Sequence, residues 1–290
     1  MIFSGIKGIT IPEGVVQQIA DGAGSILWKG GLDVAAMAIS YTGAYTDQLD
    51  VVMSGKTYRL LTLTGSGTLT IPEEVTADVW MCNGGNGGGI GGTGGGGGYL
   101  KQIEGITLDR STVCTVGAGS SGVKSTAEAA ASGLSAFGSI SPNANSGATN
   151  SGNGASGGGG GVTNRTRTGG GVSTVPFGET ALFYQHSAGG GGGGCYDRSE
   201  NYTGTGGAGG SNGSDGNAII GYASKTGGAG GNRGGGTGGD SQNNGSNATF
   251  YGSGGGGAGT YYNKYGDASS IMTGGSGYQG VIYVRIPYEQ

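Results

Sequence analysis

Residues 83–98 read NGGNGGGIGGTGGGGG, and this stretch poses the main problem that the fold has to solve. Glycine loses more conformational freedom on folding than any other residue, and it brings no side chain to a core. The chain holds 76 glycines and 5 prolines in 290 residues, a composition that without a collagen repeat is typical of low complexity. The glycine tracts lie at residues 84–98, 157–161, 189–194, 204–210, 227–239, 252–259 and 274–280.

A glycine tract can become ordered if its backbone is bonded to other tracts. In the polyglycine II helix the chain makes three residues per turn, rises about 3.1 Å per residue and forms no internal hydrogen bonds. Its N–H and C=O groups point outward and need partners, which parallel or antiparallel neighbours of the same kind can supply. We therefore expect a bundle of polyglycine II helices with loops at its ends. The alternative is that the tracts are loops of a jelly roll, although unstructured loops of this length are uncommon in compact domains.

Short apolar runs around the tracts predict β-strands. Apolar residues alternate on both sides of residues 65–67, which is typical of a hairpin formed within 58–71. Pro72 is expected to end its second strand, because proline cannot donate to a ladder. Residues 75–81 predict a third strand, and the alternating run 281–286 predicts the last strand of the chain.

The domain organisation follows from changes in composition and apolar pattern along the chain. Residues 1–32 predict a small N-terminal β attachment unit, and 33–57 a connector whose alanines would permit a short helix. Residues 58–290 form the glycine-rich domain. The predicted fold class is mainly β, a jelly-roll-like or small sheet framework with a bundle of polyglycine II helices and almost no α-helix.

Charge and apolar patterning exclude several classes of partner. The 14 Lys and Arg face 18 Asp and Glu, for a net charge of −4, and no basic tract indicates nucleic acid. No apolar run is long enough to span a membrane, and the first residues do not resemble a signal peptide. We therefore expect neither nucleic-acid binding nor membrane insertion, and synthesis in a reducing cytoplasm.

The reactive residue types do not predict an enzyme. Cys82, Cys114 and Cys195 are scattered, and with the single His186 they form no recognisable metal site or catalytic triad. Carboxylate pairs occur, but none is marked out as the pair that a glycosidase holds across its substrate. No glycine tract ends in the Lys-Ser or Lys-Thr of a phosphate-binding loop. We expect no catalytic residues, no metal and no cofactor.

A series of short motifs in a fixed order covers residues 58–286. The series consists of YRLLTL at 58–63, GSGTLTIP at 65–72, VWM at 79–81, GGGGGY at 94–99, VGAG at 116–119, SAFG at 135–138, the glycines at 189–194 and GVIYVR at 280–285. In this order the motifs resemble a glycine-rich domain common in phage tail proteins. The opening ITIPEG at 9–14 is similar to the start of tail-associated proteins from phages of gut bacteria.

The tracts are also similar to those of the tip adhesins of T-even-type long tail fibres. That resemblance implies a β framework, a polyglycine II bundle, end loops that contact the host surface, and a place in the virion tail. The glycine-rich region of some animal receptor kinases is similar in pairing such helices with a tumour-necrosis-factor-like sheet. The first 80 residues depart from the tip adhesins, which puts the mode of mounting on the virion in doubt.

If the bundle is a scaffold, binding residues should lie in the loops that it presents. Tyrosine offers a large, rigid face with a hydroxyl group, suited to stacking on sugars, and arginine can bind hydroxyls or phosphates. The candidate receptor-binding residues are Tyr196, Arg198, Tyr202, Phe250, Tyr251, Tyr261, Tyr262, Tyr265, Arg165 and Arg167. The alternative is that these rings cap the glycine helices and shield their backbone from water.

A second set of apolar residues suggests attachment. Ile2, Phe3, Ile6, Ile9 and Trp28 could be buried in a homotrimer or against another phage tail protein. Three functions then compete: a tail adhesin that recognises a host glycan or protein, a non-catalytic structural protein of the tail tip or fibre joint, and an ice-binding protein. Ice binding favours a flat face of small residues, and the irregular tyrosine-bearing and asparagine-bearing loops argue against it.

Overall fold

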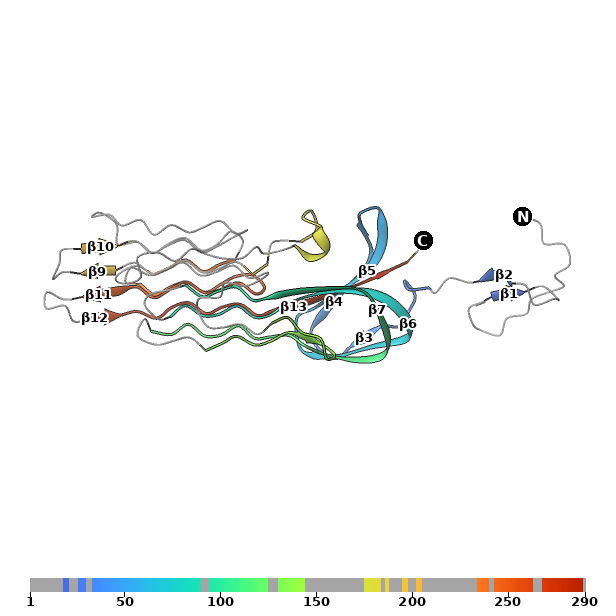
Figure 1. Cartoon of the computed structure of the whole chain (residues 1–290), viewed down its shortest axis with the longest axis horizontal. Coiled ribbons are helices and arrows are strands. Elements are labelled where there is room, and N and C mark those ends of the chain that lie inside the picture. The colour runs from blue at the N-terminus through green and yellow to red at the C-terminus, as the bar shows by residue number, and fades with distance from the viewer. Residues whose placement is uncertain are drawn as a thin grey trace.

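The computed structural model of the chain describes residues 33–89, 94–124, 130–143, 175–183, 186–187, 234–239, 243–262 and 268–288, together with strands at 18–20, 26–29, 195–197 and 202–204. This part of the chain is mainly β, as predicted, and its only helix is the single 3-10 turn Pro176–Gly178. A seven-stranded sheet lies near the middle of the molecule, and glycine segments run from it to a four-stranded sheet at one end (Figure 1). The strands β1 (Gln18–Ala20) and β2 (Ile26–Lys29) pair separately as an antiparallel hairpin, in the predicted N-terminal unit.

The seven-stranded sheet is antiparallel throughout, in the order β4-β5-β13-β6-β7-β8, with β3 also paired to β6. Its strands are β3 (Ser40–Tyr41), β4 (Tyr45–Met53), β5 (Lys56–Leu63), β6 (Gly67–Cys82), β7 (Leu100–Thr115), β8 (Ala136–Phe137) and β13 (Val281–Pro287). The last strand of the chain was predicted correctly.

The expected hairpin around residues 65–67 does not form. The C-terminal strand β13 lies between β5 and β6, so that Ile282 is opposite Leu63 on one side and Met81 on the other. The Gly65 N–H instead bonds the Ala44 carbonyl oxygen at 3.1 Å. A pattern of alternating apolar residues selects a buried face, but not the strand that fills the neighbouring position.

Strand β6 passes through Pro72 instead of ending there. Its register against β7 shifts between Ile71 and Val75, so that Pro72 lies in the irregular stretch and no ladder bond is required of it. A bulge is one of the few places where a sheet accepts proline. The predicted strands before and after Pro72 are therefore one strand of 16 residues.

The expected connector 33–57 is largely part of the sheet, because it contributes β3 and the edge strand β4. Residues 34–36 form a turn, not the short helix that the alanines would permit. The buried guanidinium of Arg59 fixes this turn by donating to the Val34 and Met37 carbonyl oxygens at 2.9 and 2.6 Å, and it pairs with the Asp47 carboxylate at 2.6 Å. One paired charge therefore ties the turn to the sheet.

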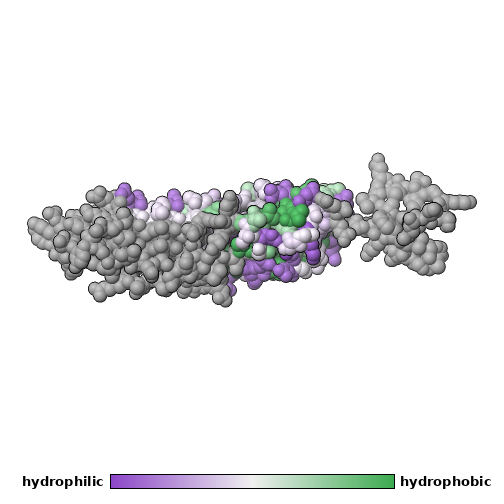
Figure 2. All heavy atoms as spheres, turned by 90° about the horizontal axis from the view of Figure 1, so that it is seen from above, coloured by the Kyte–Doolittle hydropathy of each residue, from purple (hydrophilic) through white to green (hydrophobic). Residues whose placement is uncertain are grey.

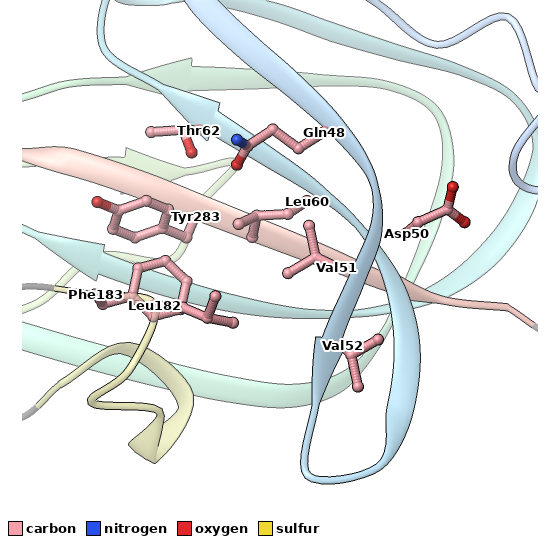
Figure 3. Close-up of a pocket in the computed structure, with 9 residues that line it drawn as sticks. All are labelled: Gln48, Asp50, Val51, Val52, Leu60, Thr62, Leu182, Phe183 and Tyr283. Carbon is pink, nitrogen blue, oxygen red and sulfur yellow. The ribbon is translucent and has the colours of Figure 1, made fainter.

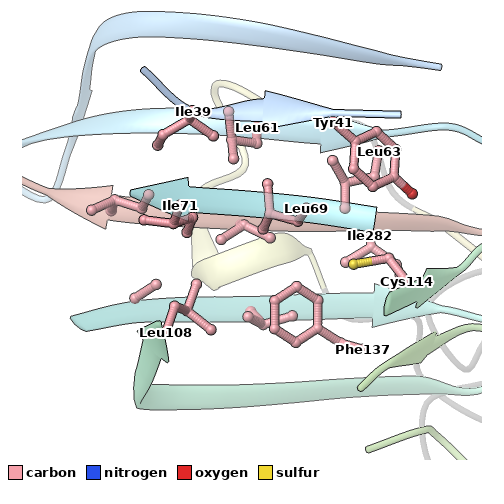
Figure 4. Packing of buried hydrophobic residues seen from close by; sticks show 14 of the residues in the cluster. Ile39, Tyr41, Leu61, Leu63, Leu69, Ile71, Leu108, Cys114, Phe137 and Ile282 are labelled. Carbon is pink, nitrogen blue, oxygen red and sulfur yellow. The ribbon is translucent and has the colours of Figure 1, made fainter. Parts of the chain in front are cut away.

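Both faces of the sheet are covered by side chains. Alternate residues of β5 point to opposite faces, with Leu61 and Leu63 in the larger cluster and Leu60 in the smaller one. Figure 4 shows the larger cluster, which includes Leu69, Ile71 and Phe137 together with Ile39 and Tyr41 from the chain before β4. The smaller cluster contains Met53, Tyr58, Leu60, Trp80, Cys82, Phe177, Phe183, Val281 and Tyr283.

Glycine segments extend β6, β7 and β13 away from the seven-stranded sheet, and segment 252–259 leads to β11 in the four-stranded sheet (Figure 1). Their backbones are bonded between segments at every third residue. In segment 83–89, the N–H groups of Gly85 and Gly88 donate to the carbonyl oxygens of Tyr278 and Gly275 at 2.8 and 2.9 Å. The same step of three recurs between segments 117–123 and 274–280. There the N–H groups of residues 280, 277 and 274 donate to the carbonyl oxygens of residues 117, 120 and 123, respectively.

Burial in this glycine array follows the same period. The inner segments 83–89, 94–98 and 252–259 are buried at every residue. In three outer segments two buried residues lie three apart, at 117 and 120, 132 and 135, and 236 and 239, and the residues between them are partly buried or exposed. The inner segments therefore touch neighbours on all sides, whereas the outer ones turn one residue in three inward.

The array leaves no room for side chains at its inner positions. A Cβ on Gly256 would lie 1.8 Å from the Thr237 carbonyl oxygen, and one on Gly275 would lie 1.8 Å from that of Ser246. Asparagine side chains can take part in the array by forming hydrogen bonds with its backbone. The side-chain oxygen of Asn247, for example, accepts a hydrogen bond from the Ser276 N–H at 2.8 Å. Contacts of backbone with backbone thus replace a side-chain core in this part of the molecule.

Candidate functional site

Four short strands at the end of the array form the candidate site. They are β9 (Cys195–Asp197), β10 (Tyr202–Gly204), β11 (Thr260–Tyr262) and β12 (Ala268–Ile271), in the order β10-β9-β11-β12. Figure 1 shows this tip sheet at the end of the glycine array that is remote from the seven-stranded sheet. Strand β11 directly continues the buried segment 252–259, so the array carries the strand to the tip.

The register of the tip sheet brings together tyrosines from distant parts of the sequence. Tyr196 of β9 is opposite Tyr261 of β11 in the parallel pair, and Thr203 of β10 is opposite Tyr196 on its other side. Thr203, Tyr196 and Tyr261 therefore form one row of the backbone register across three neighbouring strands.

The next residues along the strands form a second row of the register. Asp197 of β9 is opposite Tyr202 of β10 and also opposite Tyr262 of β11. Four of the ten residues predicted for receptor binding, Tyr196, Tyr202, Tyr261 and Tyr262, thus lie in one small sheet. They come from two separate stretches of the sequence, and only the pairing of β9 with β11 brings those stretches together.

Phe250 and Tyr251, also predicted as receptor contacts, lie at the junction between array and sheet. Their ring centroids are 5.1 and 6.1 Å from that of the buried His186, whose Nε2 is 3.1 Å from the Tyr283 hydroxyl. Trp80 packs on the same imidazole at 4.9 Å. Burial raises the pKa of Tyr251, with a further contribution from Tyr278. This position favours a packing role for both rings, as in the capping alternative.

The remaining predicted residues cannot be placed in the site. Arg165, Arg167, Arg198 and Tyr265 lie outside the described residues, as do Ile2, Phe3, Ile6 and Ile9. Trp28 belongs to β2, where it is opposite Ile19 of β1.

A cavity that no sequence pattern predicted lies beside the edge strand β4. The cavity has a volume of about 530 Å³ and opens between β4, β5, β13 and residues 182–183 (Figure 3). Apolar side chains dominate its lining, which comprises Val51, Val52, Leu60, Leu182, Phe183 and Tyr283 with Gln48, Asp50 and Thr62. Hydrophobic surface also gathers over the seven-stranded sheet in the view of Figure 2.

Next to this cavity, Arg285 is held by two aromatic rings and a carboxylate. Its guanidinium carbon lies 4.2 Å from the Phe177 ring centroid and 4.7 Å from that of Tyr58, and its Nε donates to Asp78 at 2.8 Å. Stacking and charge pairing satisfy this cation within the fold. Arg285 therefore fixes the 3-10 turn at Phe177 against the sheet.

The buried thiols are poorly suited to chemistry. Burial raises the pKa of Cys114 to about 12 and that of Cys82 further, which keeps both protonated at neutral pH and weakly nucleophilic. Among the residues that the structure describes, no three His, Cys, Asp or Glu side chains are grouped as metal ligands would be. In the same residues, no helix has the length and apolar character needed to cross a membrane.

Comparison with known proteins adds no relative. No protein-family model matches the sequence, and no curated protein matches it either.

Proposed function

We propose that the chain is a bacteriophage tail adhesin that recognises a host cell-surface receptor, a glycan or a protein, through the tip sheet β9–β12. The observation that carries this proposal is the pairing of β9 with β11, which gathers Tyr196, Tyr202, Tyr261 and Tyr262 at one end of an elongated array. Tyrosine provides contact area at low cost in conformational entropy. The N-terminal unit then joins other tail proteins.

We also propose that the glycine segments form a polyglycine II bundle, with the seven-stranded sheet as its β framework. Two observations support this assignment. Backbone bonds between segments recur at steps of three, and so do the buried residues of the outer segments. A helix with three residues per turn presents every third residue to the same neighbour. A crystal structure tests this directly, since φ near −75° and ψ near +145° are expected at residues 83–89 and 252–259.

Binding to bacterial cells tests the adhesin. Fluorescently labelled protein is mixed with a panel of bacterial strains, and cell-bound label is measured by flow cytometry. We expect binding to a subset of the strains, and its loss when Tyr196, Tyr202, Tyr261 and Tyr262 are all replaced by Ala. The control replaces Tyr45 and Tyr278, which are partly exposed tyrosines away from the tip. Full binding by the tip variant would refute this site.

A second function is favoured by the edge strand β4. Leu49 and Val52 are 47% and 61% exposed on it, beside the apolar cavity, so this edge could pack against another tail subunit. The chain would then be a structural protein of the tail tip or fibre joint. Replacing Leu49 and Val52 with Thr should block virion assembly in that case but leave cell binding intact. Absence of cell binding by the intact protein, across the panel, would favour this structural role.

A further inference from the structure

Three Asn–Gly pairs lie in the described part of the chain, at residues 83–84, 86–87 and 244–245. This dipeptide is especially open to deamidation, because glycine has no Cβ to hinder attack of its nitrogen on the asparagine side chain. The first two pairs are buried, whereas Asn244 is exposed on an outer segment of the array. Asn244 therefore combines a reactive sequence with access to water.

Both reacting groups of the pair 244–245 are bonded to one residue of the neighbouring segment. The Asn244 side-chain oxygen accepts the Thr273 N–H at 2.8 Å, and the Gly245 N–H donates to the Thr273 carbonyl oxygen at 3.0 Å. Deamidation requires the Gly245 nitrogen to lose its proton and the Asn244 side chain to turn toward that nitrogen. Both hydrogen bonds have to break first, so contact between the segments protects the pair.

We propose that Asn244 is a site of deamidation whose rate is set by separation of segment 243–249 from segment 273–276. When the segments separate, the Gly245 nitrogen bonds to the Asn244 Cγ, its proton leaves with the side-chain nitrogen as ammonia, and a succinimide ring forms. Water then opens the ring at either carbonyl carbon, which yields aspartate or isoaspartate. The net change is the addition of one water and the loss of one ammonia, with no oxidant or reductant.

The two products differ in how they fit the array. Aspartate keeps a side-chain oxygen where Asn244 had one, so the Thr273 N–H retains its acceptor. Isoaspartate carries the main chain through the former side chain, which moves that oxygen and lengthens the backbone by one carbon. The step of three residues that joins the segments is then interrupted. Because Thr273 lies two residues beyond β12, isoaspartate loosens the array next to the tip sheet.

Asn247 supplies a matched comparison three residues further along the same segment. Its side-chain oxygen accepts the Ser276 N–H at 2.8 Å, and the Ala248 N–H donates to the Ser276 carbonyl oxygen at 2.8 Å. These two bonds repeat those of Asn244, but here the Cβ of Ala248 hinders attack on the side chain. Asn247 should therefore stay intact under conditions that modify Asn244.

Peptide mapping by mass spectrometry tests the proposal on the unaltered protein. The folded protein and a synthetic peptide of residues 241–248 are incubated side by side at pH 8, and deamidation at residue 244 is followed in each. We expect the folded protein to react at least about tenfold more slowly than the peptide, because only separated segments react. Urea below the midpoint of global unfolding should raise the rate in the protein, because an outer segment opens before the whole fold does.

A pair of variants tests whether the rate follows the contact between the segments. Asn247→Ala removes the acceptor of the Ser276 N–H and should speed deamidation of Asn244 at least about threefold. Asn247→Asp keeps that acceptor and should leave the rate within about twofold of that of the unaltered protein. Neither substitution alters the reacting pair itself.

Equal rates in the folded protein and the peptide would overturn the proposal, as would modification of Asn83, Asn86 or Asn247 before Asn244. An unchanged rate in Asn247→Ala, despite lower stability, would also overturn it. The urea series keeps the test decisive if that variant fails to fold, since a rate that rises only with global unfolding contradicts opening of the segment alone. Every readout is a covalent change in the isolated protein, so the result does not depend on what the tip sheet binds.

Discussion

The seven-stranded sheet and the glycine array bury their chains by opposite means. In the sheet, side chains such as Leu61 and Trp80 are almost completely buried and fill both faces. In the array, residues 84–85 and 87–89 are buried although they have no side chains, and hydrogen bonds between backbones connect the segments. The sheet depends on the hydrophobic effect, whereas the array depends on close approach and on satisfied polar groups. The two regions should therefore respond to different perturbations.

The largest effect is expected from a single methyl group inside the array. The Cβ of Gly275→Ala would meet backbone atoms that cannot rotate away, the nearest at 1.8 Å. Overpacking a core commonly costs 1–3 kcal/mol, and here we expect a loss above about 4 kcal/mol in the free energy of unfolding, measured by chemical denaturation.

Gly55→Ala is the matched control for that substitution. The added Cβ meets nothing within 4 Å, although Gly55 has a φ of +78°, so only backbone strain of about 1–2 kcal/mol is expected. Equal losses in the two variants would mean that the array does not depend on close backbone contact.

The sheet should respond to loss of a side chain. Leu61 is fully buried in the larger cluster, and Leu61→Ala should lower the free energy of unfolding by about 3 kcal/mol through lost burial and a cavity. Val52→Ala, at an exposed position of β4, should cost less than about 0.5 kcal/mol. A cost of Leu61→Ala as small as that of its control would contradict the assignment of a side-chain core.

Alkaline pH should also weaken the sheet first, because its buried groups titrate there. Burial raises the pKa of Tyr41 and of Cys114 to about 12, and it raises those of Cys82 and Tyr283 as well. The unfolded chain loses the thiol protons near pH 9 and the tyrosine protons near pH 10, so the stabilisation is complete below about pH 8 and is lost as pH rises toward 12.

Between pH 7.5 and 9.5 we expect a loss of about 2 kcal/mol, mainly from the two thiols. Urea unfolding followed by the fluorescence of Trp80, in a Trp28→Phe background, measures it. Replacing Cys82 and Cys114 with Ala should flatten this pH dependence, even if the variant is less stable. A variant that keeps the full slope would assign the effect to other groups.

The smallest effect concerns an asparagine that completes the array. Asn247→Ala removes the acceptor for the Ser276 N–H and should cost about 1 kcal/mol in thermal or chemical unfolding. Asn247→Asp keeps an acceptor oxygen at the same place and should recover most of that loss. If Asp is as destabilising as Ala, the bond does not contribute to the array.

Part of the fold could be predicted from local patterns. The alternation in residues 281–286 predicted β13, and residues 1–32 were predicted to form a small β unit, in which β1 and β2 pair. The position of β13 between β5 and β6 could not be predicted, because alternation is the same whichever strand lies alongside. Pro72 was wrongly predicted to end a strand. The strand continues because Pro72 lies in a register shift against β7, and a single strand's sequence does not show where its partner strand shifts register.

The candidate site was predicted as residue types but not as an arrangement. Tyrosine content pointed to residues 196, 202, 261 and 262, and the pairing of β9 with β11 was needed to group them. The same reasoning also selected Phe250 and Tyr251, whose rings pack against His186 at the junction. The sequence shows aromatic residues in both places, and only their neighbours distinguish a ring at the tip from a ring in a core.

The 76 glycines alone imply that backbone contacts must hold this chain, because too few side chains remain for a core over its whole length. The alternation in residues 281–286 likewise implies the last strand. Tertiary structure alone decided which glycine segments lie side by side, which strand follows which in the sheet, and that Asp197 lies between two tyrosines. The physical reason is that a hydrogen bond between backbones is the same for every residue. The sequence can require such bonds, but only the assembled fold selects the partners.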